Sequence, residues 1–172
     1  TTIVRVQNFY DESNNLIRTI DYRDDGKPGI VTRHTYDGLN RLLMTEVLSG
    51  PSTALVGLGA THVVATNDYD VAGNRIRSTD LHGNATEYEY DGLYRLVATR
   101  LPYTVDASFS DLPFAGQQAR IETRYDRVGN KVRQTDANGH ATTWTYDAGN
   151  RLRSSFDPLD NAVRFAYDSA NN

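Results

Sequence analysis

Acidic and aromatic side chains recur together along this 172-residue chain as adjacent Tyr-Asp pairs. An array of carboxylates could serve acid–base catalysis or hold calcium, and a row of tyrosines could stack against sugar rings. A carboxylate at the start of a turn has a simpler use, because it accepts backbone N–H groups there. The seven pairs are Tyr10-Asp11, Tyr36-Asp37, Tyr69-Asp70, Tyr90-Asp91, Tyr125-Asp126, Tyr146-Asp147 and Tyr167-Asp168.

The pairs follow an internal repeat. Their successive spacings are 26, 33, 21, 35, 21 and 21 residues, so the basic unit is 21 residues long. Superimposing residues 69–89 on residues 125–145 also aligns a second aspartate and two glycines at matching offsets. Self-similarity at a fixed period indicates a repeat architecture. The further aligned positions are Gly73 with Gly129, Asp80 with Asp136, and Gly83 with Gly139.

Each repeat predicts a β-hairpin. Residues 85–90 and 141–146 alternate in polarity and are rich in threonine and aromatic residues, as strands are. A D-x-x-G element precedes each run, and its aspartate and positive-φ glycine suit a short hairpin loop. We therefore predict an all-β fold: an antiparallel meander of tandem hairpins with about twelve strands, forming a twisted or curled sheet strip. YD turns should line one edge and D-x-x-G tips the other.

Closing these hairpins predicts which residues face each other. Arg77 would pair with Glu87 on one face, and Val132 with Trp144 on the other, so charged and apolar pairs separate. Three YD turns read as one residue shorter than the others, which either a bulge or a change of strand parity must absorb. These turns are residues 36–41, 90–95 and 146–151.

Three insertions account for the longer spacings. They fall at residues 20–30, 48–61 and 101–119, each between the first and second strands of a repeat. All three are therefore expected as elongated tips on the edge opposite the YD turns. Any function peculiar to this protein should be sought in these tips.

The residues show no convincing reactive site. The spacing Asp-x-Asp-x-Asp-Gly of a calcium loop is missing, residues 21–25 being the one acidic cluster, and the four histidines lack zinc-ligand spacing. Residues 57–62 begin like a dinucleotide loop but lack its third glycine. We predict no catalytic residue, no metal and no cofactor. The YD pairs, with Gly73, Asp80, Gly83, Gly129, Asp136 and Gly139, are predicted to be structural.

Composition and charge limit the kinds of partner that this chain can bind. The net charge is −4 and the basic residues are dispersed, which argues against nucleic-acid binding. No apolar stretch approaches 18 residues, so no membrane span is expected. The absence of cysteine excludes disulfides. The length fits one domain, and residues 1–172 show no internal boundary, so we expect a single module.

The consensus Y-D-x-x-G-N-[RK]-x-R-x-T-D-x-x-G-x-A-T-x-[YW]-x resembles the Rhs/YD-repeat family over about residues 9–170. That family includes bacterial polymorphic toxins, cocoon-forming subunits of Tc toxins, and teneurins. The resemblance implies a non-enzymatic segment of a β-shell that encloses a C-terminal toxin or effector domain in a secreted or cell-surface bacterial protein. Its partners would be neighbouring YD repeats and the enclosed domain. Because the chain begins and ends within repeats, we expect a piece of a longer repeat region.

Two other functions stay open at this stage. The repeat face or the long tips could bind carbohydrate or a cell-surface partner, as is proposed for some members of the family. A hydrolase or nuclease is disfavoured, because toxic activity in that family belongs to the C-terminal domain. The open edges of a sheet strip would also allow self-association.

Overall fold

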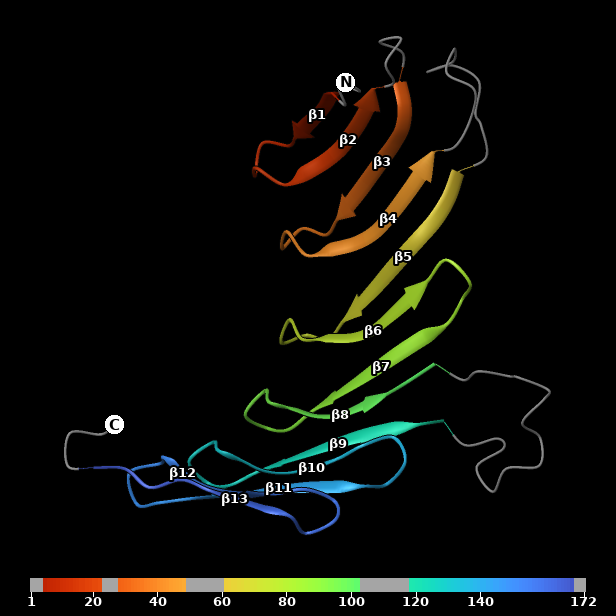
Figure 1. Cartoon of the computed structure of the whole chain (residues 1–172). Coiled ribbons are helices and arrows are strands. Elements are labelled where there is room, and N and C mark those ends of the chain that lie inside the picture. Colours follow the sequence, from red (N-terminus) through yellow and green to blue (C-terminus); the bar gives the residue numbers. More distant parts are fainter. Residues whose placement is uncertain (1–4, 23–27, 49–60, 103–117, 169–172) are drawn as a thin grey trace, which may run out of the picture. The chain divides into compact units, whose positions relative to one another are not determined.

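The computed structural model describes residues 5–22, 28–48, 61–102 and 118–168, which form strands joined by turns (Figure 1). The strands are β1 (Arg5–Tyr10), β2 (Leu16–Tyr22), β3 (Pro28–Tyr36), β4 (Leu42–Leu48), β5 (Thr61–Tyr69), β6 (Arg75–Asp80), β7 (Ala85–Tyr90), β8 (Leu96–Arg100), β9 (Arg120–Tyr125), β10 (Lys131–Thr135), β11 (Ala141–Tyr146), β12 (Leu152–Phe156) and β13 (Ala162–Arg164).

Strand order follows chain order from β1 to β13, which confirms the predicted all-β antiparallel meander. Each strand pairs with its sequence neighbours, as when Val31 of β3 lies opposite Leu48 of β4. The order ends at β1 and β13, so the sheet is open. The described residues form thirteen strands instead of about twelve, because a short β13 follows the turn at Asp157.

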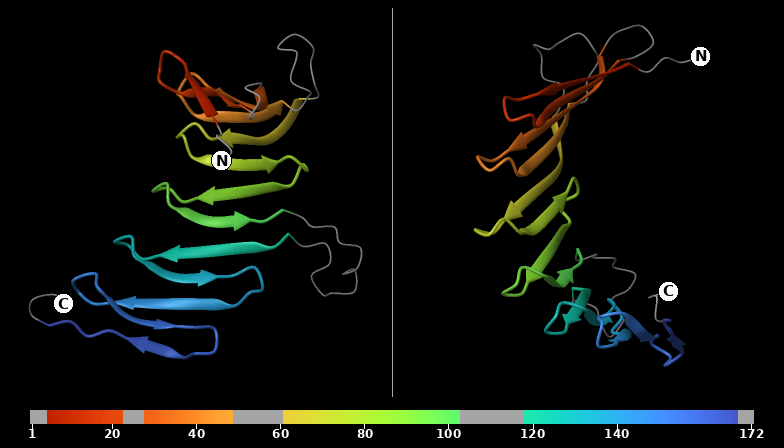
Figure 2. Two further views of the ribbon diagram at one scale, coloured as in Figure 1. Left: turned by 45° about the horizontal axis from the view of Figure 1, so that its top comes forward. Right: turned by 90° about the vertical axis from the view of Figure 1, so that its left-hand side faces the viewer.

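The chain divides into two compact units, Thr1–Ala85 and Thr86–Asn172, with β7 beginning at the boundary. Within each unit the YD turns lie along one edge and the other connections along the opposite edge (Figure 2). We describe each unit by itself. The expectation of a single module over residues 1–172 stays a prediction.

One turn geometry serves both edges. In each of the nine described hairpin turns, the aspartate N–H donates to the carbonyl four residues later, and its own carbonyl accepts the N–H three residues later. The residue at that third position adopts a left-handed conformation, with φ of 93° at Gly73 and 61° at Asn40. These are the features of a type I turn followed by a bulge, and they need glycine or a residue such as asparagine at the left-handed position.

The prediction that three YD turns are one residue shorter is wrong. Asp37 closes on Arg41 as Asp70 closes on Asn74, four residues later in both cases. The glycine of the longer-looking turns is replaced by Asn40, Tyr94 or Asn150 at the same left-handed position. A bulge, not a change of strand parity, accompanies the turns: in five of the YD hairpins the register shifts directly before the tyrosine.

The predicted separation of charged and apolar pairs onto two faces fails in the first unit, where the register pairs Val31–Leu48 and Arg33–Glu46 lie two residues apart and so share a face. In the second unit the two kinds of pair lie on different faces. Register pairs Arg133–Thr143 and Thr135–Ala141 fix the β10–β11 hairpin in the frame that sets Val132 opposite Trp144. Charged pairs lie on the other face, where Arg100 is 3.8 Å from Glu87. The pairing of Arg77 with Glu87 stays a prediction.

The sheet encloses almost no core. Among the described residues, the buried hydrophobic side chains are Ile20 and Ala98, which are 6% and 2% exposed. Large apolar side chains such as Leu39 and Val71 stand exposed at turn tips. Because core packing is so limited, the backbone ladder and the turns must carry most of the stability of this single layer.

The insertions lie mostly outside the described residues, at 23–27, 49–60 and 103–117. The acidic cluster at 21–25 and the loop at 57–62 fall largely there too. The strands that these segments join are β2–β3, β4–β5 and β8–β9, and these junctions lie on the edge opposite the YD turns, as predicted.

The left-handed position gives a first test. Gly129 has a φ of 100°, whereas Gly92, in the neighbouring YD turn, has no positive φ and would accept a Cβ without contacts. Gly129→Ala should lower the free energy of unfolding by about 1–3 kcal/mol, measured by urea titration with Trp144 fluorescence. Gly92→Ala is the matched control, with an expected gain of about 0.4–1 kcal/mol. Equal urea midpoints for the two variants would contradict the turn geometry.

Candidate functional site

The edge of YD turns is the most elaborated part of the structure, and each turn is organised by its aspartate. In the turn at Asp37, one carboxylate oxygen accepts the N–H groups of Leu39 and Arg41 at 2.8 and 3.0 Å. The other oxygen accepts Nε of Arg41 at 2.6 Å. The carboxylate therefore satisfies the backbone donors that a tight turn leaves unpaired. The same pair of backbone bonds forms at Asp11, Asp80, Asp91, Asp126, Asp136, Asp147 and Asp157.

These bonds keep the carboxylates charged. The side chain of Arg95 is the main cause that lowers the pKa of Asp91 below its usual 3.8. The backbone N–H of Arg41 does the same for the pKa of Asp37, and the Asn74 side chain for that of Asp70. A general acid needs a raised pKa, so the direction of these shifts fits hydrogen-bond acceptors in a scaffold and not proton donors in catalysis.

Two kinds of YD turn alternate along the edge. The residue four positions after the aspartate is asparagine in one kind and arginine in the other. In both kinds this side chain reaches back to the aspartate carboxylate. We call them Asn turns and Arg turns. The Asn turns are at Asp11, Asp70 and Asp126, and the Arg turns at Asp37, Asp91 and Asp147.

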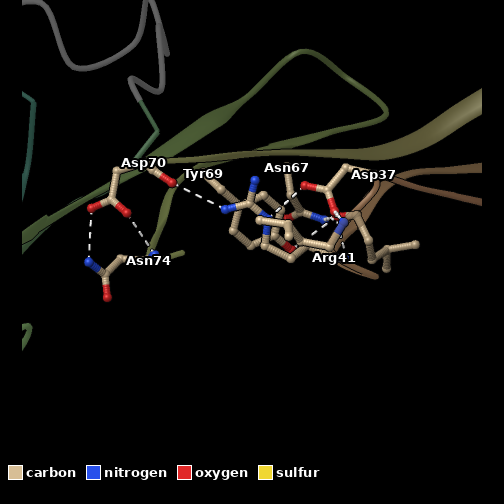
Figure 3. A network of polar contacts seen from close by, with 8 residues as sticks. Asp37, Arg41, Asn67, Tyr69, Asp70 and Asn74 are labelled. Carbon is tan, nitrogen blue, oxygen red and sulfur yellow. Dashed lines mark hydrogen bonds and ion pairs between the residues drawn. The ribbon is translucent and has the colours of Figure 1, made fainter. Parts of the chain in front are cut away.

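The Arg turns at Asp37 and Asp91 each contact the Asn turn that follows. Arg41 donates from Nη1 to the Asp70 carbonyl at 3.1 Å, and its guanidinium lies over the Tyr69 ring, 4.8 Å from the centroid (Figure 3). In the second unit Arg95 makes the same hydrogen bond to Asp126 at 3.2 Å and stacks over the ring of Tyr125. A cation over a tyrosine face adds electrostatic attraction to this contact.

Asn turns contact the Arg turn that follows. Asn15 donates from its amide to Oδ1 of Asn40 at 2.9 Å, and Asn130 donates to Oδ1 of Asn150 at 3.2 Å. The accepting asparagine is the left-handed residue of its own turn. In the remaining Arg turn, at Asp91, that position holds Tyr94, which has no amide oxygen to accept such a bond.

The YD tyrosines complete this edge network. The Tyr69 hydroxyl donates to the Leu42 carbonyl at 3.1 Å, so the tyrosine of one YD turn is joined to the end of the preceding YD turn. These hydroxyl bonds and the stacked arginines hold the tyrosine rings in place between successive turns. The same kind of bond joins Tyr36 to Leu16, Tyr125 to Leu96, Tyr146 to Lys131 and Tyr167 to Leu152.

The residues predicted to be structural therefore lie in or next to the turns at the two edges of the sheet. The four predicted glycines, Gly73, Gly83, Gly129 and Gly139, all take positive φ. Tyr90 and Asp168 are engaged in interactions as well. Their structural importance stays a prediction until it is tested by substitution. In the part of the chain that the structure describes, no group of three or more potential metal ligands gathers, and no helix could span a membrane.

Sequence reasoning missed the residues that link the turns. The alternation of asparagine and arginine four positions after each aspartate is visible in the sequence and could have been noticed. The carbonyl acceptors of the tyrosine hydroxyls leave no such signal, because any residue type supplies a backbone carbonyl. The residues concerned are Asn15, Arg41, Asn74, Arg95, Asn130 and Arg151.

A single-layer meander of aspartate-closed hairpins defines a tandem β-hairpin repeat protein. The family model of the RHS repeat matches residues 125–155 of this chain. It is similar to the tRNA3(Ser)-specific nuclease WapA of Bacillus spizizenii, at 29% identity over 168 residues. The match covers 91% of this chain but 7% of that protein, so the chain spans a small part of its relative.

Solved structures share the fold. A crystal structure of TcdB2-TccC3 matches with a TM-score of 0.66 and 19% identity, over 96% of this chain and 9% of that chain. The Tc holotoxin pore of Photorhabdus luminescens matches with a TM-score of 0.65 and 19% identity, over 97% of this chain and 8% of that one. TcdB2-TccC3 without its hypervariable C-terminal region gives the same 0.66 over 96% of this chain and 8% of its own. The shared fold therefore lies outside that region.

The tyrosine hydroxyl gives the second test. Tyr69→Phe removes the bond to the Leu42 carbonyl and should lower the free energy of unfolding by about 0.5–1.5 kcal/mol in urea titration. Tyr94→Phe is the control, because that side chain is 65% exposed at a turn tip and should change stability little. A Tyr69→Phe variant as stable as Tyr94→Phe would show that the bond contributes nothing.

The aspartate network predicts loss of stability in acid. A carboxyl group whose pKa is lower in the folded chain than in the unfolded chain stabilises the fold above its unfolded pKa, here near 3.8. That stabilisation is lost as pH falls through the lowered folded value. The urea midpoint should therefore be flat from pH 7 to about 5 and fall steeply below about 4.

The control for the acid prediction is Asp91→Asn, which removes one titrating group and should make the acid decline shallower. High salt should weaken the effect, since these carboxylates lie at the surface. A urea midpoint that does not change between pH 5 and pH 2.5 would contradict the network.

Proposed function

We propose that this chain is wall material: a non-enzymatic RHS-repeat segment of a β-sheet shell that encloses the C-terminal effector domain of a secreted bacterial protein. The observation that carries the proposal is the match of the whole described fold to TcdB2-TccC3 with and without its hypervariable C-terminal region. The matched part of those chains lies outside their hypervariable C-terminal region, which is where a shell wall is expected.

The physical design of the sheet supports a wall. A layer with so few buried hydrophobic side chains gains little from a core, and it stays ordered by linking each turn to the next. Such a structure lengthens by adding repeats, because each hairpin contacts mainly its neighbours. Its exposed apolar tips, including Leu93 and Val128, favour covering by further protein.

The chemistry of the edge supports a non-enzymatic segment. The YD carboxylates accept backbone and side-chain hydrogen bonds, and their pKa values are lowered, not raised. The nuclease named among the relatives is more than ten times the length of this chain, so its activity does not transfer to these repeats.

The alternative is a module that binds carbohydrate or a cell surface. The positions of the aromatic rings argue against it. A sugar platform needs open ring faces, yet Arg41, Arg95 and Arg151 lie over the rings of Tyr69, Tyr125 and Tyr167, and Lys131 lies over Trp144. Among the described residues, the exposed aromatics that a sugar-binding role would have to use are Tyr10, Tyr94 and Phe165, of which Tyr94 is the most exposed.

Limited proteolysis of the longer natural protein tests whether these repeats enclose its C-terminal domain. Removing one repeat, residues 126–146, should open the shell and make the C-terminal domain at least about tenfold more sensitive to protease, because local opening is what exposes a protected chain. Tyr94→Phe in the same protein is the control and should leave protection intact. Equal sensitivity of the intact and shortened proteins would refute enclosure. Glycan binding lost in Tyr94→Ala would instead favour the alternative.

A further inference from the structure

Arginines lie directly opposite each other on neighbouring strands at three places. The register pairs are Arg18–Arg33 between β2 and β3, Arg100–Arg120 between β8 and β9, and Arg124–Arg133 between β9 and β10. Like charges at directly opposed positions destabilise a sheet, because their Cβ atoms are only about 5 Å apart. Each pair therefore needs a compensating interaction.

The Arg100–Arg120 pair is bridged by one carboxylate from the same sheet. One oxygen of Glu89 lies 2.5 Å from Nη2 of Arg100, and the other lies 2.8 Å from Nη2 of Arg120. Arg120 also approaches Glu122 at 3.4 Å. A carboxylate that gives one oxygen to each guanidinium matches the planar donor geometry of arginine.

The Arg18–Arg33 pair in the first unit is also compensated internally. Arg33 lies 3.8 Å from Glu46 on β4. Arg18 lies over the ring of Phe9, 4.0 Å from its centroid, where the quadrupole of the ring attracts the cation.

The third pair, Arg124–Arg133, has no such partner. Both residues are exposed, and within the described part of the chain neither makes an ion pair. Glu122 lies two residues before Arg124 on the same face, but it is engaged with Arg120. On its other side Arg133 faces Thr143, a neutral residue. The Arg124–Arg133 register pair thus repeats the Arg100–Arg120 register pair without a carboxylate partner.

We propose that Arg124 and Arg133 bind the carboxylate of an aspartate or glutamate side chain presented by another polypeptide segment on this face of the second unit. Glu89 shows the chemistry: one carboxylate, one oxygen to each arginine. The inference goes beyond the proposed wall and does not depend on it, because it rests on the register of β9 and β10 alone.

Titration of the 172-residue chain with capped peptides tests the site, with the arginine side-chain NMR signals as the readout. A peptide of alternating glutamate and glycine should shift the Nε–Hε signals of Arg124 and Arg133. Either Arg124→Gln or Arg133→Gln should weaken binding about tenfold, since a hydrogen bond to a charged group is lost. Arg127→Gln, at an exposed turn position, is the matched control and should bind like the unchanged chain.

Three results of this titration would overturn the proposal. The first is equal binding of the matching glutamine peptide, and the second is an Arg127→Gln variant weakened as much as Arg133→Gln. The third is inorganic phosphate or acetate reproducing the shifts with no further gain from the peptide, which would make the pair a simple anion site.

A second pair of variants tests the same geometry without removing an arginine. Thr143→Glu puts a carboxylate directly opposite Arg133 on the same face. It should occupy the arginines from within, raise the urea midpoint and weaken peptide binding about tenfold. Thr142→Glu lies opposite Gln134 on the other face and should leave binding unchanged. Unchanged binding by Thr143→Glu would also refute the proposal.

Discussion

The bond between each turn aspartate and the backbone of its own turn is the interaction on which this structure depends. A five-residue turn directs several N–H groups away from the strand ladder, and one carboxylate oxygen collects two of them. This arrangement matters more here than in a globular domain, because the sheet has almost no core to hold its strands in register. Hydrogen bonds within the turns therefore hold the strands in register, as core packing does in a globular domain.

The second level of organisation joins one turn to the next. An arginine that closes its own turn also binds the carbonyl of the following YD aspartate and covers the following tyrosine. Asparagine turns reach forward through their amides instead. The structural repeat along this edge is therefore two YD turns long, twice the unit that the sequence spacing suggests. Residues separated by 20 to 31 positions in the chain become neighbours in this way.

The same edge accounts for the acidic and aromatic residues that could have suggested a reactive site. Their carboxylates are held as anions by hydrogen bonds, and their rings and hydroxyls are engaged by arginines and carbonyls. Side chains that could still bind a partner lie on the charged face of the second unit. There the Arg124–Arg133 pair lacks the carboxylate that Glu89 provides to the Arg100–Arg120 pair. Residues that break a local rule in an otherwise consistent repeat point to contacts beyond the chain.

The sequence alone determined the hairpin repeat, the strand order and the edge on which the insertions lie, because period-2 alternation and turn residues are local signals. It misled on three turns, since Asn40, Tyr94 and Asn150 replace glycine at a left-handed position and looked like a deletion. Only the tertiary structure decided what links the turns. Whether Tyr69 meets Leu42, or Arg124 meets Arg133, depends on the register between hairpins, and bulges shift that register by one residue.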